Sequence, residues 1–260
     1  MVSLDALAFV RFGLRAADDP RIVSTVKVID ATLRLDTPRG SAWHRYQGDS
    51  YGEHADGTPF DGRGIGRAWP LLTGERAHYE LAAGRRNEAL RLLRALEAFA
   101  GDGGLLPEQV WDTADLPAKE LYFGRPSGSA MPLVWAHAEY VKLRRSLADG
   151  RVFDMPRQTV ERYLVGKRRA AHASWRLNHK SRSCPAGRTL RIEVPRPATV
   201  RWSADDWRTT ADVETRDTGV GMFIADLPTT ALGPGTIVRF TLRWADEDRW
   251  EGADFAVEIQ

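Results

Sequence analysis

One glutamate in this sequence stands where the chain can hold a side chain rigidly. Glu108 lies between Pro107 and Gln109, directly after the glycine-rich residues 101–104. A loop end of this kind fixes a carboxylate without placing it in a helix, and a carboxylate held beside aromatic residues can act as a general base on a water molecule. Because an isolated loop glutamate is usually a solvated surface charge, the role of Glu108 depends on the residues around it.

Residues 43–52 form a second segment whose groups could bind a ligand rich in hydroxyls. The segment combines the guanidinium of Arg45, the carboxylate of Asp49, the imidazole of His44 and three aromatic side chains. Arginine can donate to sugar hydroxyls and aspartate can accept from them, while aromatic rings can stack on a sugar ring. The alternative interpretation is a structural loop with a local pair between Arg45 and Asp49.

Helices are expected to position these two segments. Asp19 followed by Pro20 is typical of a helix start, and apolar residues then recur at helical spacing. Asn87 and Ser129 can cap two later helices, because their side chains can accept hydrogen bonds from the first free backbone N–H groups. The apolar faces of the three helices comprise Ile22, Val26, Ile29 and Leu33; Leu92, Leu93, Leu96 and Phe99; and Leu133, Ala136, Tyr140, Leu143 and Leu147.

Residues 64–83 form a further expected helix. Pro70 and Gly74 predict a kink or break within it. Thr73 could cap its second half, and Gly84 suits its end. The helical carboxylates that we interpret as surface charges are Glu75, Glu80 and Glu97.

The pattern changes after Gly150. Residues 159–164 can form one last helical turn, and from about Ala170 apolar and polar residues alternate between glycine-containing turns, as in β-strands. Five or more short strands at this spacing predict an antiparallel β-sandwich. The expected strands are 189–194, 199–202, 222–225, 237–244 and 255–259.

Four tryptophans in this second part could stack on sugars. Trp202 and Trp244 end strand-like runs, so core packing is the favoured interpretation for them. Trp207 and Trp250 lie among acidic residues in expected loops and are the better surface candidates.

The composition is that of an ordinary globular protein and excludes several functional classes. The 260 residues are 43% hydrophobic and 28% charged, which is enough apolar content for one or two folded domains. The net charge of +2 provides no attraction to nucleic acid or to an anionic membrane. Cys184 is the single cysteine, so no intrachain disulfide can form, and the histidines lack zinc-binding spacing. The first residues lack the features of a signal peptide, which favours a cytoplasmic location.

Four segments occur in an order that resembles one known family. They are residues 44–51, with the pattern Arg-Tyr…Asp…Tyr; residues 64–81, with Thr73-Gly74-Glu75-Arg76; Leu106-Pro107-Glu108-Gln109; and residues 129–136. This order is similar to that of the glucoamylases and glucodextranases, the inverting exo-glucosidases of glycoside hydrolase family 15. The β-strand part resembles the C-terminal modules of some bacterial members only loosely.

The resemblance implies roles for single residues. It implies that Glu108 is the general base, that no cofactor or metal is needed, and that the substrate is an α-glucan or oligosaccharide. Asp112 and Asp115 could tune Glu108 or bind sugar, but neither resembles the general acid. The residues that the resemblance assigns to substrate binding are His44, Arg45, Tyr46, Asp49, Tyr51, Trp69 and Trp135.

The same resemblance implies an incomplete catalytic domain. The family's domain is an (α/α)6 toroid whose general acid lies well upstream of the Arg-Tyr…Asp…Tyr pattern, and nothing in this sequence matches the surroundings of that acid. We therefore expect residues 1–165 to be the C-terminal part of such a toroid and residues 166–260 to be a β-sandwich module. Uncovered apolar helix faces would then bind the missing part of the barrel or a second copy of this chain. The alternative is a non-catalytic protein that binds a saccharide or only packs against another polypeptide.

Overall fold

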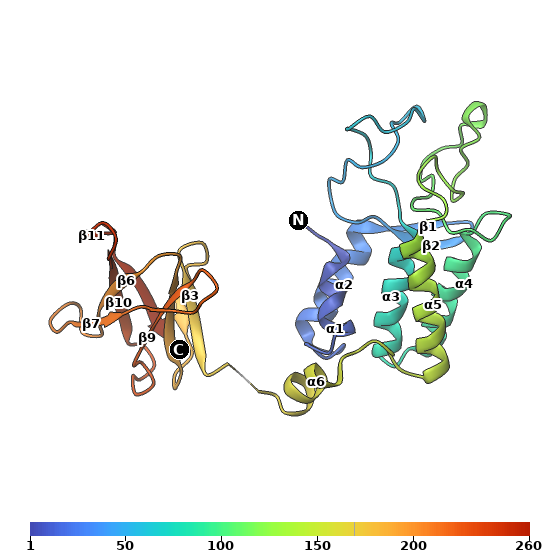
Figure 1. The fold of residues 1–260 in the computed structure, drawn as a ribbon. Coiled ribbons are helices and arrows are strands. Elements are labelled where there is room, and N and C mark those ends of the chain that lie inside the picture. The colour runs from blue at the N-terminus through green and yellow to red at the C-terminus, as the bar shows by residue number, and fades with distance from the viewer. Residues whose placement is uncertain (169) are drawn as a thin grey trace. The chain divides into compact units, whose positions relative to one another are not determined.

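The computed structural model describes residues 1–168 and 170–260. The chain divides into two compact units, Met1–Arg168 and Arg169–Gln260, each with its own hydrophobic core (Figure 1). The first unit is mostly helical and the second is built from strands, and the helices of the described residues form no closed barrel. No helix in this part of the chain is long and apolar enough to span a membrane.

Helices α3, α4 and α5 form the centre of the first unit. Helix α3 packs against both α4 and α5, and Figure 1 shows the three side by side. The main elements of the unit are α2 (Pro20–Leu33), β1 (Arg34–Thr37), β2 (Gly40–Trp43), α3 (Pro70–Ala82), α4 (Arg86–Ala98) and α5 (Val134–Asp149). The shorter ones are η1 (Leu4–Leu7), α1 (Ala8–Arg11), η2 (Pro117–Lys119), α6 (Arg157–Thr159) and η3 (Val160–Val165).

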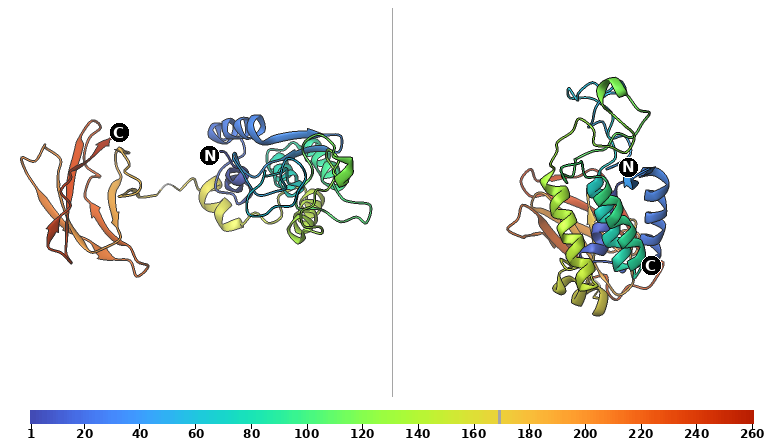
Figure 2. Two further views of the ribbon diagram at one scale, coloured as in Figure 1. Left: turned by 90° about the horizontal axis from the view of Figure 1, so that it is seen from above. Right: turned by 90° about the vertical axis from the view of Figure 1, so that its right-hand side faces the viewer.

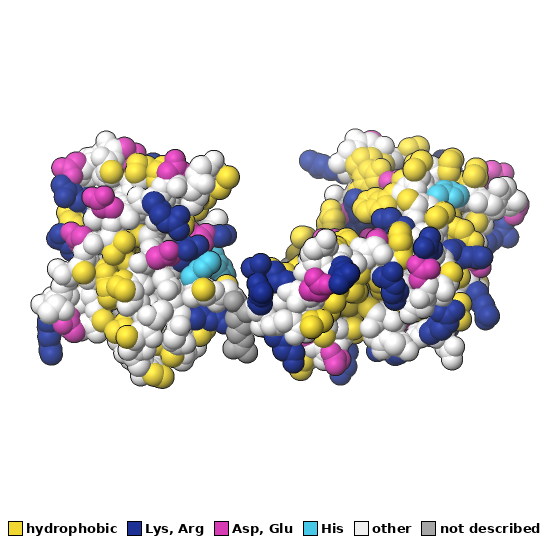
Figure 3. All heavy atoms as spheres, turned by 60° about the horizontal axis from the view of Figure 1, so that its bottom comes forward, with side chains coloured by type: hydrophobic (Ala, Val, Ile, Leu, Met, Phe, Trp, Pro, Cys, Tyr) yellow, Lys and Arg dark blue, Asp and Glu magenta, His cyan; other side chains and the backbone are white. Residues whose placement is uncertain are grey.

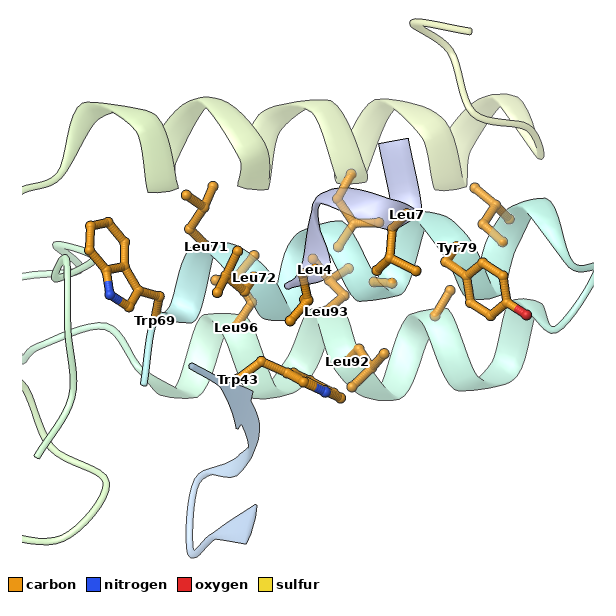
Figure 4. Close-up of a cluster of buried hydrophobic side chains, with 14 of the residues drawn as sticks. Leu4, Leu7, Trp43, Trp69, Leu71, Leu72, Tyr79, Leu92, Leu93 and Leu96 are labelled. Atoms are coloured by element: carbon orange, nitrogen blue, oxygen red, sulfur yellow. The ribbon is translucent and has the colours of Figure 1, made fainter. Parts of the chain in front are cut away.

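The first expected helix is confirmed as α2. Asp19 accepts a hydrogen bond from the backbone N–H of Arg21 at 3.0 Å, and Pro20 occupies the first turn, where its missing N–H costs nothing. The four apolar residues predicted on one face of this helix are all buried. They join a core with side chains from β2, α3 and α4, among them Trp43, Tyr79 and Leu96 (Figure 4).

Three expectations for the starts of helices are wrong. Helix α3 begins at Pro70 and is unbroken, so the proline starts the helix instead of kinking it. Thr73 is buried inside α3, where its hydroxyl donates to the carbonyl of Ser41 at 3.0 Å, and it caps no helix. Asn87 lies in the first turn of α4 and not at its cap, because α4 begins one residue earlier. Gly84 does follow the end of α3, with a φ of 76°.

Two of the three helical glutamates are not the surface charges that we expect from the sequence. Glu80 is buried and pairs with both Arg76 and Arg85. Burial, together with repulsion from Glu139 of α5, raises the pKa of Glu75 to about 7. Only Glu97 is exposed. Charged residues therefore contribute to the contacts of α3 with its neighbours.

The hairpin of β1 and β2 is absent from the sequence-based expectations. Its strands pair from Arg34↔Trp43 to Thr37↔Gly40, with Pro38 and Arg39 at the turn. A Cβ atom at Gly40, whose φ is 124°, would lie 2.4 Å from the Cβ of Ala95 in α4. Only glycine therefore allows the hairpin to pack against that helix.

Long loops extend from one end of the helices. Residues 44–69 lead into the N-terminus of α3, and residues 99–133 connect the C-terminus of α4 to the N-terminus of α5. Figures 1 and 2 show these loops rising from the same end of the helical unit. Isolated β-bridges join Val110 of the second loop to Ala68 of the first. The segments with the candidate site residues are therefore adjacent in space.

The second unit has a six-stranded sheet and a four-stranded sheet that share one core. The larger sheet has the order β4-β12-β10-β6-β7, with β11 beside β10, and the smaller has the order β3-β5-β9-β8. Strands β5, β10 and β12 have the bounds expected from the sequence. The strands are β3 (His172–Arg176), β4 (Ser183–Cys184), β5 (Thr189–Val194), β6 (Ala198–Ser203), β7 (Ala211–Glu214), β8 (Arg216–Asp217), β9 (Phe223–Leu227), β10 (Ile237–Trp244), β11 (Arg249–Trp250) and β12 (Phe255–Ile259).

The expectation of purely antiparallel pairing is wrong at two places. Strand β3 pairs with β5 in parallel, and β4 pairs with β12 in parallel. Both β3 and β4 are edge strands that the alternation pattern did not reveal. Their pairing joins segments that no tight turn connects, so local sequence patterns do not predict it.

The tryptophans of the second unit divide between core and surface. Trp244 is buried and its Nε1 donates to Glu251 at 2.8 Å, as a core position requires. Trp250 is exposed, and the guanidinium of Arg201 lies 5.1 Å from its ring centroid. Trp202 and Trp207 are half-buried.

Candidate active site

Glu108 lies in a segment that is hydrogen-bonded to neighbours on two sides. Its backbone N–H donates to the carbonyl of Ala130 at 2.8 Å, and the N–H of Val110 donates to the carbonyl of Ala68 at 3.0 Å. Glu108 as a whole residue is 9% exposed, and it lines a pocket. The carboxylate is therefore held before any ligand arrives, which suits a group that must meet a reacting water at a defined position.

The side chain of Gln109 joins the two long loops directly beside Glu108. Ser129, which we expected to cap α5, instead accepts the backbone N–H of Gln109 at 2.9 Å. The Nε2 atom of Gln109 donates to the carbonyl of Tyr51 at 2.9 Å, and its Oε1 accepts the N–H of Arg67 at 3.1 Å. The hydroxyl of Tyr51 then donates to Oε2 of Glu108 at 3.3 Å. Tyr51 and Glu108 thus meet although 57 residues separate them.

Arg45 and Asp49 form a bidentate ion pair. The two N···O distances are both 2.7 Å, and the Asp49 side chain is almost fully buried. Burial opposes ionisation of Asp49, but the hydrogen bonds from Arg45 outweigh it and lower the pKa of Asp49. The bond to Asp49, and to a smaller extent the charge of Glu108, raise the pKa of Arg45. Both groups therefore stay charged over the physiological range.

Aromatic rings surround the guanidinium of Arg45. Its central carbon lies 4.8 Å from the ring centroid of Trp69, 4.9 Å from that of Tyr51 and 5.4 Å from that of Tyr46. Such cation–π contacts fix the plane of the guanidinium. Arg45, Tyr46, Asp49, Tyr51 and Trp69 thus form one cluster, which we call the Arg45 cluster, and Tyr51 links it to Glu108.

Gly66 provides the space that Asp49 occupies. A Cβ atom at residue 66 would lie 2.4 Å from the Cβ and Cγ atoms of Asp49. The backbone N–H of Gly66 also donates to the carbonyl of Asp49 at 2.9 Å. The close contact between Gly66 and Asp49 thus places the segment before α3 against the segment that carries Arg45.

A fully buried arginine, Arg67, forms hydrogen bonds with three residues near the site. Arg67 donates to Oδ1 of Asp112 at 2.6 Å and to the carbonyls of Glu53 and His54 at 2.9 and 3.0 Å. Asp112 is thus a structural partner of Arg67. His44 lies with its Nε2 3.1 Å from Oδ2 of Asp112, without the geometry of a hydrogen bond, and burial lowers the pKa of His44 although Asp112 opposes the shift.

The pocket beside Glu108 has a volume of about 350 Å³, within the range of small-molecule sites. Among the substrate-binding residues suggested by the sequence, Tyr51 lines it directly. Trp135 is not among its lining residues and is 58% exposed at the start of α5. The structure therefore does not bring Trp135 to this pocket. The lining residues are Tyr51, Gly52, Glu53, Gly57, Pro59, Phe60, Glu108, Gln109, Lys119, Leu121, Gly128, Ser129 and Ala130.

Comparison with known proteins identifies the family of this chain. The model of the family described as glycosyl hydrolases family 15 matches residues 3–145, more than half of the chain. The chain belongs to glycoside hydrolase family 15. Glu108 and the whole Arg45 cluster lie within the matched residues. The sequence resemblance to a bacterial glucoamylase is thereby confirmed.

This family 15 chain is similar to parts of three longer proteins. It is 46% identical over 159 residues to the glucoamylase of Clostridium sp. (strain G0005), a match that covers 61% of this chain and 21% of the relative. It is 30% identical over 97 residues to a cycloisomaltooligosaccharide glucanotransferase of Niallia circulans, covering 33% of this chain and 10% of that protein. The solved structure of a bacterial glucoamylase complexed with acarbose matches with a TM-score of 0.57 and 46% identity, over 62% of this chain and 22% of that one. The chain thus spans about a fifth of the length of the two glucoamylases.

Sequence reasoning assigned no role to three residues that build the candidate site. Gln109, Arg67 and Glu53 are all buried between the two loops. Gln109 directly follows Glu108, and Arg67 lies two residues before Trp69. Their closeness in the sequence to these two candidate residues was the available signal. Glu53 carried none, because an acidic residue in a loop is normally exposed. Among the described residues, no group of three or more His, Cys, Asp or Glu side chains is arranged to hold a metal ion.

Proposed function

We propose that this chain forms the general-base side of an exo-acting, inverting glycosidase that releases glucose from α-glucans. The observation that carries the proposal is the fixed carboxylate of Glu108, hydrogen-bonded to Tyr51 of the Arg45 cluster and facing a pocket. In this role Glu108 removes a proton from the attacking water. His44, Arg45, Tyr46, Asp49, Tyr51 and Trp69 are proposed to bind the terminal glucose.

An inverting mechanism needs a second carboxyl group. It protonates the leaving oxygen from the opposite side of the sugar ring, roughly 6.5–9.5 Å from the base. No residue of this chain resembles that acid, so we propose that another part of a longer catalytic domain supplies it. On this proposal the first unit is part of an (α/α)6 toroid, residues 1–165, and residues 166–260 are a β-sandwich module.

Exposed apolar side chains on the first unit support an incomplete helical domain. Figure 3 shows hydrophobic side chains at the surface of this unit. Exposed apolar side chains that lie together at a surface often mark a contact with other elements or with a partner. We propose that the missing part of the barrel, or a second copy of the chain, covers them. They include Phe9, Phe12, Val28, Val134, Trp135 and Val141.

The test is hydrolysis of maltose, isomaltose and trehalose, with the anomer of the released glucose followed by NMR. We expect little turnover by the 260-residue chain alone and restored turnover when the missing N-terminal segment of the domain is added. The first product should be β-glucose, since water attacks opposite the α-linked leaving group.

Glu108→Gln should then lower turnover by about 10²–10⁴-fold, the usual contribution of a general base, while the fold is retained. Asp115→Asn is a suitable control, because Asp115 is an exposed carboxylate of the same loop that accepts the N–H of Phe123 at 2.7 Å. Turnover that survives Glu108→Gln would show that another carboxylate is the base. Turnover by the isolated chain that requires Glu108 would show that this chain contains the acid.

A non-catalytic saccharide-binding protein is the second candidate. The Arg45 cluster favours it, because its hydrogen bonds and ring contacts are complete without a general acid. This candidate predicts that maltose binds to the isolated chain and that no added segment produces turnover. Binding by titration calorimetry and hydrolysis measured on the same samples distinguish the two candidates.

A further inference from the structure

Glu53 is a buried carboxylate that lacks a full set of partners. Its residue surface is 6% exposed, and it lines the same pocket as Glu108. Its Oε2 atom is buried and has no hydrogen-bond partner among the described residues. Burying an unpaired carboxylate oxygen is costly, and native proteins rarely leave such an atom unsatisfied unless a ligand or water completes it.

Hydrogen bonds to the backbone carbonyl of Glu53 hold this residue in position. Arg67 donates to the carbonyl of Glu53 at 2.9 Å, and the N–H of Ile65 approaches the same carbonyl at 3.4 Å. On the side-chain end, Gly128 leaves the necessary space, since a Cβ atom there would lie 3.0 Å from Oε1 of Glu53. These contacts hold the backbone of Glu53 and leave its Oε2 atom without a hydrogen-bond partner among the described residues.

The pocket lining carries charged groups of both signs. Glu53 and Glu108 line the pocket together with Lys119, and Arg45 lies close to Glu108. Arg45 is already paired with Asp49, so Lys119 is the cation of the pocket lining that faces these two carboxylates. A carboxylate oxygen without a partner can accept a hydrogen bond, and the hydroxyl groups of a sugar can donate one.

We propose that Glu53 is a substrate-binding residue whose Oε2 accepts a hydrogen bond from one hydroxyl of the sugar in the Glu108 pocket. The inference rests on the proposed function, because it takes the ligand to be an α-glucoside. A buried acceptor of this kind rejects an analogue that lacks the matching hydroxyl, since the carboxylate would then stay unpaired. Glu53 therefore helps to determine which sugar binds, whereas Glu108 takes the proton from the attacking water.

The experiment measures binding of maltose and of its monodeoxy analogues to the full 260-residue chain by calorimetry and NMR titration. The wild type should bind one deoxy analogue much more weakly than maltose. Glu53→Gln should weaken maltose binding about 10-fold or more, as expected for the loss of a hydrogen bond to a charged group. The same variant should bind maltose and that one analogue about equally.

Two glycine variants provide a second test and its matched control. Gly128→Ala presses a methyl group against Oε1 of Glu53 and should weaken maltose binding while it keeps the carboxylate. Gly103→Ala, in the loop before Glu108, meets no atom within 4 Å and should bind as the wild type does. Thermal unfolding of all variants reports whether the fold is intact.

The outcomes separate this inference from the proposed function. If the wild type binds maltose and Glu53→Gln binds it equally well, Glu53 is not a substrate-binding residue, although the proposed function stands. A loss that is uniform over the deoxy series would instead indicate a structural role and overturn the inference. If the wild type binds no α-glucoside, the proposed function fails and the role of Glu53 fails with it.

Discussion

At the scale of single residues, the site is organised before a ligand binds. The guanidinium of Arg45 is held by two bonds to Asp49 and by three aromatic rings, and Glu108 is held by its backbone and by Tyr51. Preorganised polar groups do not need to reorient when the ligand enters, so less binding free energy is lost to ordering side chains.

Arg45→Lys should weaken binding of maltose about 10-fold. A lysine ammonium cannot form the two parallel bonds to Asp49 and does not stack on Trp69 as a planar group does. Titration calorimetry measures the effect. Arg145→Lys is the matched control, because Arg145 also pairs with an aspartate four residues later, Asp149, but on an exposed helix face. Equal losses in the two variants would show that the geometry of Arg45 does not matter for binding.

At the scale of elements, buried charges connect segments that are distant in the sequence. Arg67 ties the loop before α3 to Asp112 of the loop after α4. Arg11 of α1 donates to both carboxylate oxygens of Glu139 in α5, and His78 of α3 lies 2.7 Å from the same carboxylate. Such pairs specify which elements meet, because an unpaired buried charge disfavours other arrangements.

Arg67→Met should destabilise the first unit by about 3–5 kcal/mol, the usual cost of leaving one member of a buried pair alone. The variant leaves the Asp112 carboxylate without its buried partner and removes the donors to two backbone carbonyls. Urea unfolding measures the free energy. Adding Asp112→Asn should recover part of the loss, since the unpaired charge is then removed. A double variant no more stable than Arg67→Met would contradict this account.

Glu75 should make the stability of the first unit depend on pH. Its pKa is raised from 4.5 to about 7 in the folded chain, so the folded state binds the proton more tightly than the unfolded state does. The stability should therefore fall as pH rises from about 4.5 through 7. Glu75→Gln should be more stable than the wild type at pH 8, by up to about 3 kcal/mol from the size of the shift, and nearly equal to it at pH 4.

Chemical denaturation of both proteins across this pH range tests the Glu75 prediction. Glu97→Gln serves as the control, because Glu97 is exposed and pairs with Arg144 at the surface. A wild type whose stability is flat between pH 5 and 8, relative to Glu75→Gln, would refute the raised pKa. The other charged groups that act on Glu75 are Glu139, Arg11, Asp5 and Lys142.

At the scale of the whole molecule, the chain consists of two units with separate cores. The core of the second unit contains Trp175, Phe240 and Trp244, and its members come from both sheets. The pocket, Glu108 and the Arg45 cluster all belong to the first unit. We therefore expect the second unit to contribute to stability or binding separately from the chemistry at Glu108.

Residues 170–260 expressed alone should fold and unfold cooperatively. A core that draws on two sheets buries enough apolar surface for a domain of this size to be stable by itself. Circular dichroism during heating and a dispersed NMR spectrum are the measurements. A fragment without a cooperative transition would show that the second unit depends on the first.

The sequence by itself determined the features that depend on neighbours along the chain. Asp19 and Pro20 start α2, and alternation of apolar residues defines β5 and β10 with their observed bounds, because capping and side-chain periodicity are local properties. Four short motifs, one of them around Glu108, together indicated the family, since the residues of each motif and the order of the motifs are read directly from the chain.

Only the tertiary structure decided which polar groups meet. Ser129 accepts the N–H of Gln109 instead of capping α5, and Glu80 is buried between two arginines instead of exposed. Trp135 lies outside the pocket and Glu53 lies inside it, contrary to what their local surroundings predict. Local sequence defines the alternatives open to a polar side chain, but the partner that satisfies it, and hence its burial, comes from a distant segment that only folding brings near.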